Sequence, residues 1–122
     1  MTHFKNLIAW QKAMNLVKET YLLLKKYPKD ELFGLISQTK RAVISIPSNI
    51  AEGAGRNYKK DTVQFLHIAR GSLYELETLF HIAVMTTILA ETEFTHISRS
   101  IDETHKILNG LINSFERRNG LK

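Results

Sequence analysis

Apolar residues recur every three or four positions along almost the whole chain, and this spacing limits the fold more than any other feature of the sequence. An α-helix brings residues with this spacing to one face, whereas a half-buried β-strand needs strict alternation. The pattern predicts helices over residues 8–26, 31–54, 59–89 and 93–118. Tyr27-Pro28 ends the first helix because proline disfavours helical geometry at the residue before it, and Asp30 is expected to cap the second.

Short connections make consecutive helices antiparallel neighbours, so the predicted architecture is all-α, an up-down-up-down four-helix bundle. The 122 residues, 43% of them hydrophobic, fit a single domain spanning 1–122 whose core needs no metal or disulfide. The chain has no cysteine, which excludes thiol catalysis and cysteine-based metal sites and is typical of the cytoplasm. No stretch is apolar enough to be a signal peptide or membrane span, so we expect a cytoplasmic protein without membrane contact or cofactor.

The stretch SIPSNIAEGAGR, residues 45–56, places a proline and two glycines in and after the second predicted helix. Pro47 removes the hydrogen bond to the Val43 carbonyl, which costs roughly 3 kcal/mol in a plain helix. The three-four spacing nevertheless continues through it, so we expect the helix to bend and continue, with nearby serine hydroxyls accommodating the proline. Gly53 and Gly55 allow a close approach or a left-handed turn into the third helix.

A polar ladder with the same spacing lies opposite the apolar stripe of this helix. It is either a solvated face or a contact surface, and the second interpretation is favoured by serine, proline and asparagine, which are poor helix formers. The ladder consists of Gln38, Arg41, Ser45, Ser48, Glu52 and Arg56.

The net charge of +5 is unevenly distributed, because residues 1–60 hold 11 Lys or Arg against 4 Asp or Glu. Such a basic half favours an anionic partner. Arg56, Lys59 and Lys60 surround the start of the third helix, where free N–H groups can hold a phosphate, although the glycines there also fit a plain helix end.

Several motifs resemble the four-helix-bundle family of 23S rRNA intervening-sequence proteins: WQKA, LISQTKRA, SIPSNIAEGAGR and FLHIARGSLYELET, spanning residues 7 to about 85. That family is similar to the accessory protein of diversity-generating retroelements, a basic pentameric ring that binds nucleic acid and a reverse transcriptase. The resemblance implies a pentamer here. Family members often carry serine before the Lys-Lys pair that opens the third helix, whereas this chain has Tyr58, so Asn57 is expected to cap that helix. The resemblance implies functional roles for Gln38, Lys40, Arg41, Ser48, Asn49, Glu52, Arg56 and Arg70.

These observations predict a non-catalytic, homo-oligomeric protein that binds the phosphate backbone of RNA or DNA through a basic surface of its second and third helices. Wide apolar stripes on the first and third helices support self-association. The expected nucleic-acid contacts are Lys40, Arg41, Arg56, Lys59, Lys60 and Arg70. The expected surface for a neighbouring subunit or partner is Gln38, Ser45, Pro47, Ser48, Asn49, Glu52, Gly53 and Gly55.

Two alternatives stay open. The first is a protein-interaction scaffold that does not bind nucleic acid, which salt dependence of binding would distinguish. The second is a metal-independent ribonuclease using Arg99 and His105, whose spacing is similar to the R-x(4–6)-H motif of HEPN domains. A di-iron site is excluded because Glu93-x-x-His96 and Asp102-x-x-His105 lie on one predicted helix and cannot face each other.

Overall fold

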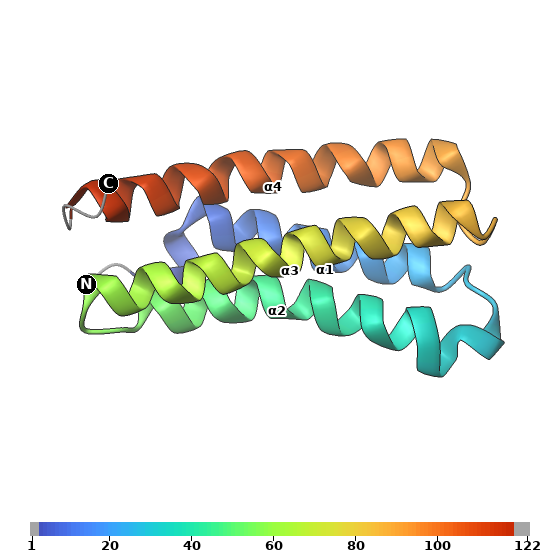
Figure 1. Cartoon of the computed structure of the whole chain (residues 1–122), viewed down its shortest axis with the longest axis horizontal. Helices are drawn as coiled ribbons and strands as arrows, with labels where there is room; N and C mark the ends of the chain where they lie inside the picture. Colours follow the sequence, from blue (N-terminus) through green and yellow to red (C-terminus); the bar gives the residue numbers. More distant parts are fainter. Residues whose placement is uncertain (1–2, 119–122) are drawn as a thin grey trace.

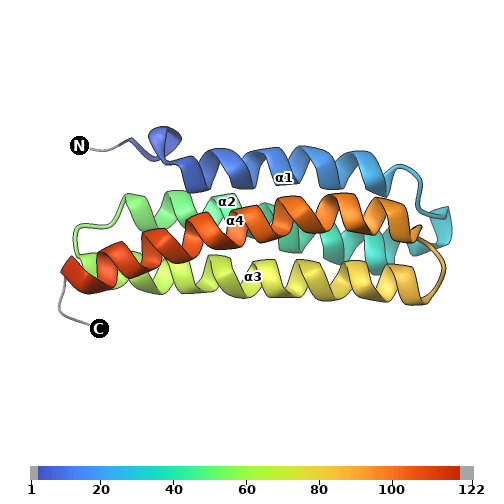
Figure 2. The same ribbon diagram turned by 90° about the horizontal axis from the view of Figure 1, so that it is seen from above.

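The computed structural model describes residues 3–118 and confirms the all-α, four-helix architecture. The helices are α1 (Ile8–Leu24), α2 (Ser37–Ala54), α3 (Lys59–Met85) and α4 (Glu91–Arg118), with short helical turns at η1 (Phe4–Asn6), η2 (Lys29–Glu31) and η3 (Leu32–Ile36). Each long helix runs antiparallel to the one before it (Figures 1 and 2). α2 packs against α1 and α3, and α4 against α1 and α3, so the four helices form a closed ring around the core.

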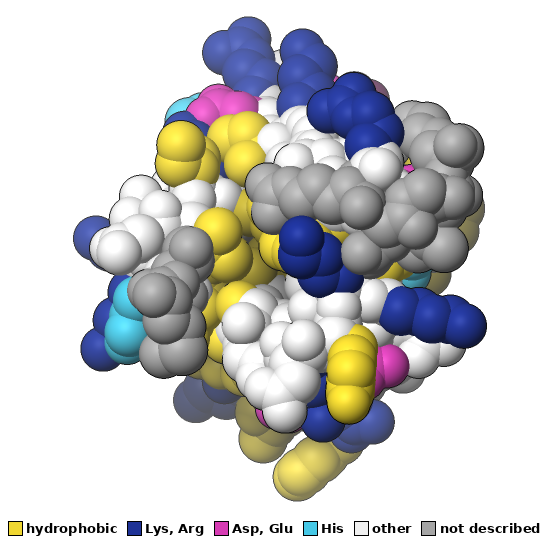
Figure 3. Space-filling model, turned by 90° about the vertical axis from the view of Figure 1, so that its left-hand side faces the viewer, with side chains coloured by type: hydrophobic (Ala, Val, Ile, Leu, Met, Phe, Trp, Pro, Cys, Tyr) yellow, Lys and Arg dark blue, Asp and Glu magenta, His cyan; other side chains and the backbone are white. Residues whose placement is uncertain are grey.

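One end of the bundle gathers the start of α1, the end of α2, the start of α3 and the end of α4 (Figure 1). Figure 3 looks onto this end and shows lysine and arginine side chains around its rim with hydrophobic side chains between them. The opposite end carries the α1–α2 connection and the α3–α4 turn. No helix within residues 3–118 combines the length and the apolar composition that crossing a bilayer requires.

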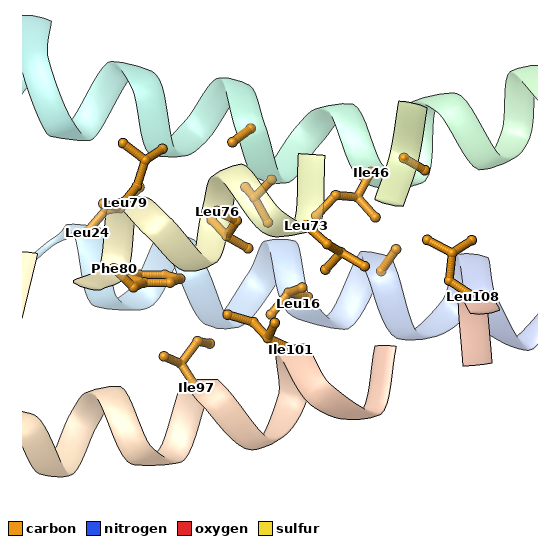
Figure 4. Packing of buried hydrophobic residues seen from close by; sticks show 14 of the residues in the cluster. Leu16, Leu24, Ile46, Leu73, Leu76, Leu79, Phe80, Ile97, Ile101 and Leu108 are labelled. Atoms are coloured by element: carbon orange, nitrogen blue, oxygen red, sulfur yellow. The ribbon is translucent and has the colours of Figure 1, made fainter. Parts of the chain in front are cut away.

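The core is a column of aliphatic side chains with one phenylalanine, contributed by all four helices (Figure 4). Leu16, Ile46, Leu73, Phe80 and Ile101 have no accessible surface, and each lies on the apolar stripe that the sequence predicts. Burial of such side chains stabilises the fold by about 1.5–3 kcal/mol each, so the three-four spacing is also the main source of tertiary stability.

The start of the second helix differs from the prediction. Residues 32–36 form a single π-helical turn, in which Gly34 has non-helical backbone angles (φ −110°, ψ −109°), and α2 begins only at Ser37. The expected Asp30 cap is wrong, because the Glu31 carboxylate accepts the hydrogen bond from the Leu35 amide at 3.0 Å. The apolar spacing continues through this kink, which is why the sequence pattern alone predicted one uninterrupted helix.

Three other boundaries move by a few residues: α1 ends at Leu24 instead of 26, α3 ends at Met85 instead of 89, and α4 begins at Glu91. At the end of α3, the Ile88 amide donates to the Ala83 carbonyl at 2.8 Å and the Thr87 amide to Val84 at 3.0 Å. This is a Schellman motif, with Thr87 in the left-handed region at φ 63°. Glycine usually occupies that position. Because this chain has threonine there, the sequence did not indicate that the helix ends.

The start of α3 also corrects an expectation. Tyr58, in extended conformation, is the N-cap residue, and no side chain provides a capping hydrogen bond there. The expected Asn57 cap is therefore wrong, and the first turn of α3 begins without a side-chain acceptor for its amides.

Candidate functional site

α2 continues without a break through Pro47, as predicted, and the side chain of Pro47 is buried. The hydroxyl of Ser48 donates to the Ile44 carbonyl at 2.8 Å, in the turn where the proline ring disturbs the backbone. Pro47 lines a groove of about 350 Å³ between α1 and α2, together with Trp10, Met14 and Ile44. The proline thus faces an apolar groove, whereas Ser48 at the groove edge is exposed.

The other polar residues of the SIPSN segment bind within the chain. Ser45 and Ser72 of α3 share a hydrogen bond between their hydroxyls at 2.8 Å. The Asn49 amide donates to the Ser45 carbonyl at 2.8 Å and to its hydroxyl at 2.9 Å. Ser45, expected at a surface for a partner, thus also contacts α3, whereas the hydrogen bonds of Asn49 stay within α2.

Gly53 is a position of close approach between α2 and α3. A Cβ atom at this position would lie 3.0 Å from the Phe65 Cβ and 3.1 Å from the Thr62 carbonyl oxygen, closer than side chains normally pack. The Thr62 hydroxyl donates to the Gly53 carbonyl at 2.7 Å. Gly55 ends α2 with φ −87°, so it does not use the left-handed conformation that glycine permits.

Three exposed cations surround the α2–α3 connection, and we call Arg56, Lys59 and Lys60 the basic turn. The Arg56 guanidinium pairs with Glu52 of α2 at 2.8 Å and lies over the Phe65 ring, 4.5 Å from its centroid. Both lysines lie in the first turn of α3, where amides lack a side-chain cap. Lysine and arginine side chains are conspicuous on this end of the bundle (Figure 3).

The remaining cations expected in the same surface lie elsewhere on α2. Arg41 and Arg56 are separated by roughly 20 Å along the helix axis, given a rise of about 1.5 Å per residue. The Lys40 ammonium lies over the Tyr21 ring of α1, 5.0 Å from its centroid, while Gln38 and Arg41 are exposed. The structure therefore does not gather Lys40 and Arg41 into one patch with the basic turn.

Arg70 belongs to a polar seam between α3 and α4 that sequence reasoning missed. Its guanidinium nitrogens lie 2.8 Å from His67 Nδ1 and 3.0 Å from Asn109 Oδ1, and His67 Nε2 lies 3.4 Å from a Glu116 carboxylate oxygen. Residues 67, 70, 74, 77 and 81 of α3 step by three and four, which was the signal available in the sequence. We call His67, Arg70, Asn109 and Glu116 the α3–α4 seam.

Arg99 and His105 do not converge. Six residues along one helix set them about 120° apart around its axis. Arg99 is exposed, whereas the His105 ring packs against Tyr74 of α3 at 4.6 Å between centroids. Burial lowers the pKa of His105, Arg70 lowers it further, and the carboxylates of Glu77 and Asp102 act in the opposite direction. Within residues 3–118, no group of three or more His, Asp or Glu side chains is placed to hold a metal ion.

Two comparisons with known proteins match most of the chain. The family model of the 23S rRNA-intervening sequence protein matches residues 5–110. A crystal structure of a protein with unknown function from the S23 ribosomal protein family of Bacteroides thetaiotaomicron superposes with a TM-score of 0.80. The two sequences are 21% identical, and the superposition covers 87% of this chain and 96% of the chain in the crystal structure. No curated protein matches the sequence.

Proposed function

This chain belongs to the 23S rRNA-intervening sequence protein family, and from that premise we propose that it is a homo-oligomeric protein that binds RNA by its phosphate backbone. The observation that carries the proposal is the basic turn. It presents Arg56, Lys59 and Lys60, all exposed, around the uncapped N-terminus of a 27-residue helix.

The basic turn suits phosphate for two physical reasons. The free amides of the first turn and the helix dipole attract anions, and lysine ammonium groups neutralise phosphate charge and release its counterions. Glu52 and Asp61 offset part of this charge, and Glu52 also fixes the Arg56 guanidinium. The exposed ring of Tyr58, between Arg56 and Lys59 in the sequence, adds one face on which an unpaired base can stack. This surface recognises backbone and shape, and offers little for reading base sequence.

Fluorescence anisotropy with a labelled RNA hairpin at two salt concentrations tests the proposal. The double variant Lys59→Ala/Lys60→Ala should weaken binding about tenfold or more and reduce the slope of log affinity against log salt by about 2, one per phosphate contact. Lys18→Ala/Lys106→Ala is the matched control, since both lysines are exposed on other helices. An unchanged slope in the first variant would show that the basic turn is not the site.

Arg41→Ala determines how far the RNA surface extends. If RNA follows α2 beyond the basic turn, this variant also lowers the salt slope by about 1. If the surface is confined to the basic turn, Arg56→Ala weakens binding and Arg41→Ala does not. In both cases RNA of unrelated sequence is affected alike, because phosphate contacts carry no sequence information.

Self-association is proposed through the outer face of α1 and α2. Three hydrophobic side chains of α1 have 43–60% of their surface exposed: Ile8, Met14 and Leu22. Ile44 of α2 is 43% exposed. Pro47 shapes the groove that Met14 and Ile44 share. Light scattering is expected to give the mass of a pentamer, as the resemblance implies, and a monomer at micromolar concentration would contradict the proposal.

Pro47→Ala tests the role of the proline in this assembly. The variant restores a backbone donor and adds helix propensity, so the fold should be retained with equal or higher stability. The assembly should weaken because the groove changes shape. If neither the oligomer size nor the RNA affinity changes, Pro47 contributes only to packing within the bundle.

A further inference from the structure

The connection between α1 and α2 is held in an irregular but defined shape. After Pro28 the chain forms η2 and η3, and Gly34 departs from helical geometry. The Glu31 carboxylate binds the Leu35 amide at 3.0 Å and occupies the space beside Gly34, where a Cβ atom would approach it to 2.8 Å. A capping hydrogen bond and a glycine thus maintain this shape together.

This shape turns two large hydrophobic side chains outward. Phe33 is 92% exposed and Leu32 is 50% exposed. An isolated exposed hydrophobic residue needs no explanation, but Leu32 lines a groove of about 470 Å³, and Phe33 is the next residue in the chain. Leu24, Ile36, the buried Tyr27 ring and Leu32 itself line the groove, so an apolar floor continues onto an apolar outer edge.

The groove carries positive charge without compensation in its lining. Lys25, Lys29 and Lys40 are among its lining residues, and Asp and Glu are not. Tyr27 does not offset this charge, because a phenol is neutral near pH 7, and burial, with a smaller effect of the Glu93 carboxylate, raises its pKa further, to about 12. Asp30 and Glu31 follow Lys29 in the sequence but are not among the lining residues, and the Glu31 carboxylate accepts the hydrogen bond of the Leu35 amide. An apolar floor with a purely cationic rim fits an occupant that is apolar on one side and acidic around it.

We propose that this groove docks a protein partner through a short amphipathic segment, whose apolar side chains fill the groove while flanking Asp and Glu residues pair with Lys25, Lys29 and Lys40. Such segments use side chains at i, i+3, i+4 and i+7 as anchors. The exposed Phe33 extends the apolar contact at the edge. This function is independent of RNA binding, because the basic turn lies at the opposite end of the bundle.

Other occupants fit less well. Single-stranded nucleic acid binds to exposed aromatic faces, but Lys40 covers Tyr21 and Tyr27 is 6% exposed, which leaves Phe33 alone. A second copy of the chain in a two-fold contact would place the lysine rim against itself.

Two labelled synthetic peptides of roughly 15 residues test the proposal, with leucine and phenylalanine at the four anchor positions and either Glu or Lys elsewhere. The intact protein should bind the Glu peptide about tenfold or more tightly than the Lys peptide. Phe33→Ala and Lys25→Glu/Lys29→Glu should each reduce Glu-peptide affinity about tenfold or more. Their controls are Ile68→Ala, an exposed residue of α3, and Lys106→Glu on α4, and both should bind like the unaltered protein.

Several results would overturn the proposal: no binding of the Glu peptide, equal binding of the two peptides, or equal affinity of Phe33→Ala and Ile68→Ala. A uridine-rich single-stranded oligonucleotide serves as the competing probe. Loss of oligonucleotide affinity in Phe33→Ala with unchanged peptide affinity would assign the groove to nucleic acid instead. Loss of RNA affinity in Lys59→Ala/Lys60→Ala with peptide binding retained separates this test from that of the proposed function.

Discussion

α3 packs on its two neighbours in different ways, and the contrast explains the unusual residues of this chain. Against α2 the contact includes small residues of α2: Gly53 lies against Phe65 of α3, and the hydroxyl of Ser45 shares a hydrogen bond with that of Ser72. Against α4, Arg70 reaches across to the side chain of Asn109. Small residues let two backbones approach closely and leave no room for change, whereas long polar side chains bridge a wider gap and tolerate adjustment.

The contrast also gives a packing role to residues that the sequence singled out as functional. Glycine and serine in a helix, or a lone arginine, resemble a ligand site when their surroundings are unknown. Here Gly53 and Ser45 serve the packing of α2 on α3, and Arg70 serves the packing of α4 on α3. Unfolding measurements on variants of these residues, together with a pH series, show how far the two interfaces differ.

The largest effect is expected at Gly53. Gly53→Ala should lower the free energy of unfolding by about 2 kcal/mol, because the new methyl group meets the Thr62 backbone and the Phe65 Cβ at about 3 Å. Gly71→Ala on α3 is the control, since nothing lies within 4 Å of its Cβ position, and it should stabilise by about 0.5–1 kcal/mol. Urea unfolding measures both. Similar values for the two variants would disprove the close approach of α2 and α3.

Arg70→Ala should cost about 1–2 kcal/mol, because it removes the hydrogen bond to Asn109 and the contact with His67 in a half-buried setting. Arg41→Ala should change the free energy of unfolding by less than about 0.5 kcal/mol, since that side chain is exposed. If Arg70→Ala instead weakens RNA binding and leaves stability unchanged, its seam contacts contribute nothing to the fold.

The Ser45–Ser72 hydrogen bond is measured best by a double-mutant cycle. Each Ser→Ala substitution should cost about 1 kcal/mol, and the double variant should cost less than the sum, with a coupling of about 0.5 kcal/mol or more. Additive costs would mean that the two hydroxyls are not paired in solution.

The smallest effect is the pH dependence of the free energy of unfolding that His105 of α4, packed against Tyr74 of α3, should cause. Because burial lowers the pKa of His105 below its ordinary value of 6.5, the unfolded chain binds the proton more readily than the folded one. The free energy of unfolding should therefore be unaffected by His105 above about pH 6.5. Below that pH it should decrease, because the unfolded chain takes up the proton more readily. His105→Phe retains a ring against Tyr74 and should reduce this dependence in urea titrations at several pH values. An identical pH profile in the variant would assign the effect to another group.

Periodicity in the sequence is sufficient to predict the helices and their buried faces. Ile46 and Ile50 continue the apolar stripe past Pro47, and both are fully buried in a helix that runs through the proline. This works because the position of a residue on a helix face depends only on its neighbours along the same helix. The prediction fails where the backbone leaves the helix without a familiar signal, as at Thr87, whose Schellman turn lacks glycine.

The partners of the polar residues were decided only by the tertiary structure. Nothing near Ser45 or Arg70 in the sequence indicates Ser72 or Asn109, which lie 27 and 39 residues away. Which side chains meet across two helices depends on how each helix is rotated and shifted along its neighbour. That arrangement results from all the core contacts together, so no single segment of the sequence determines it.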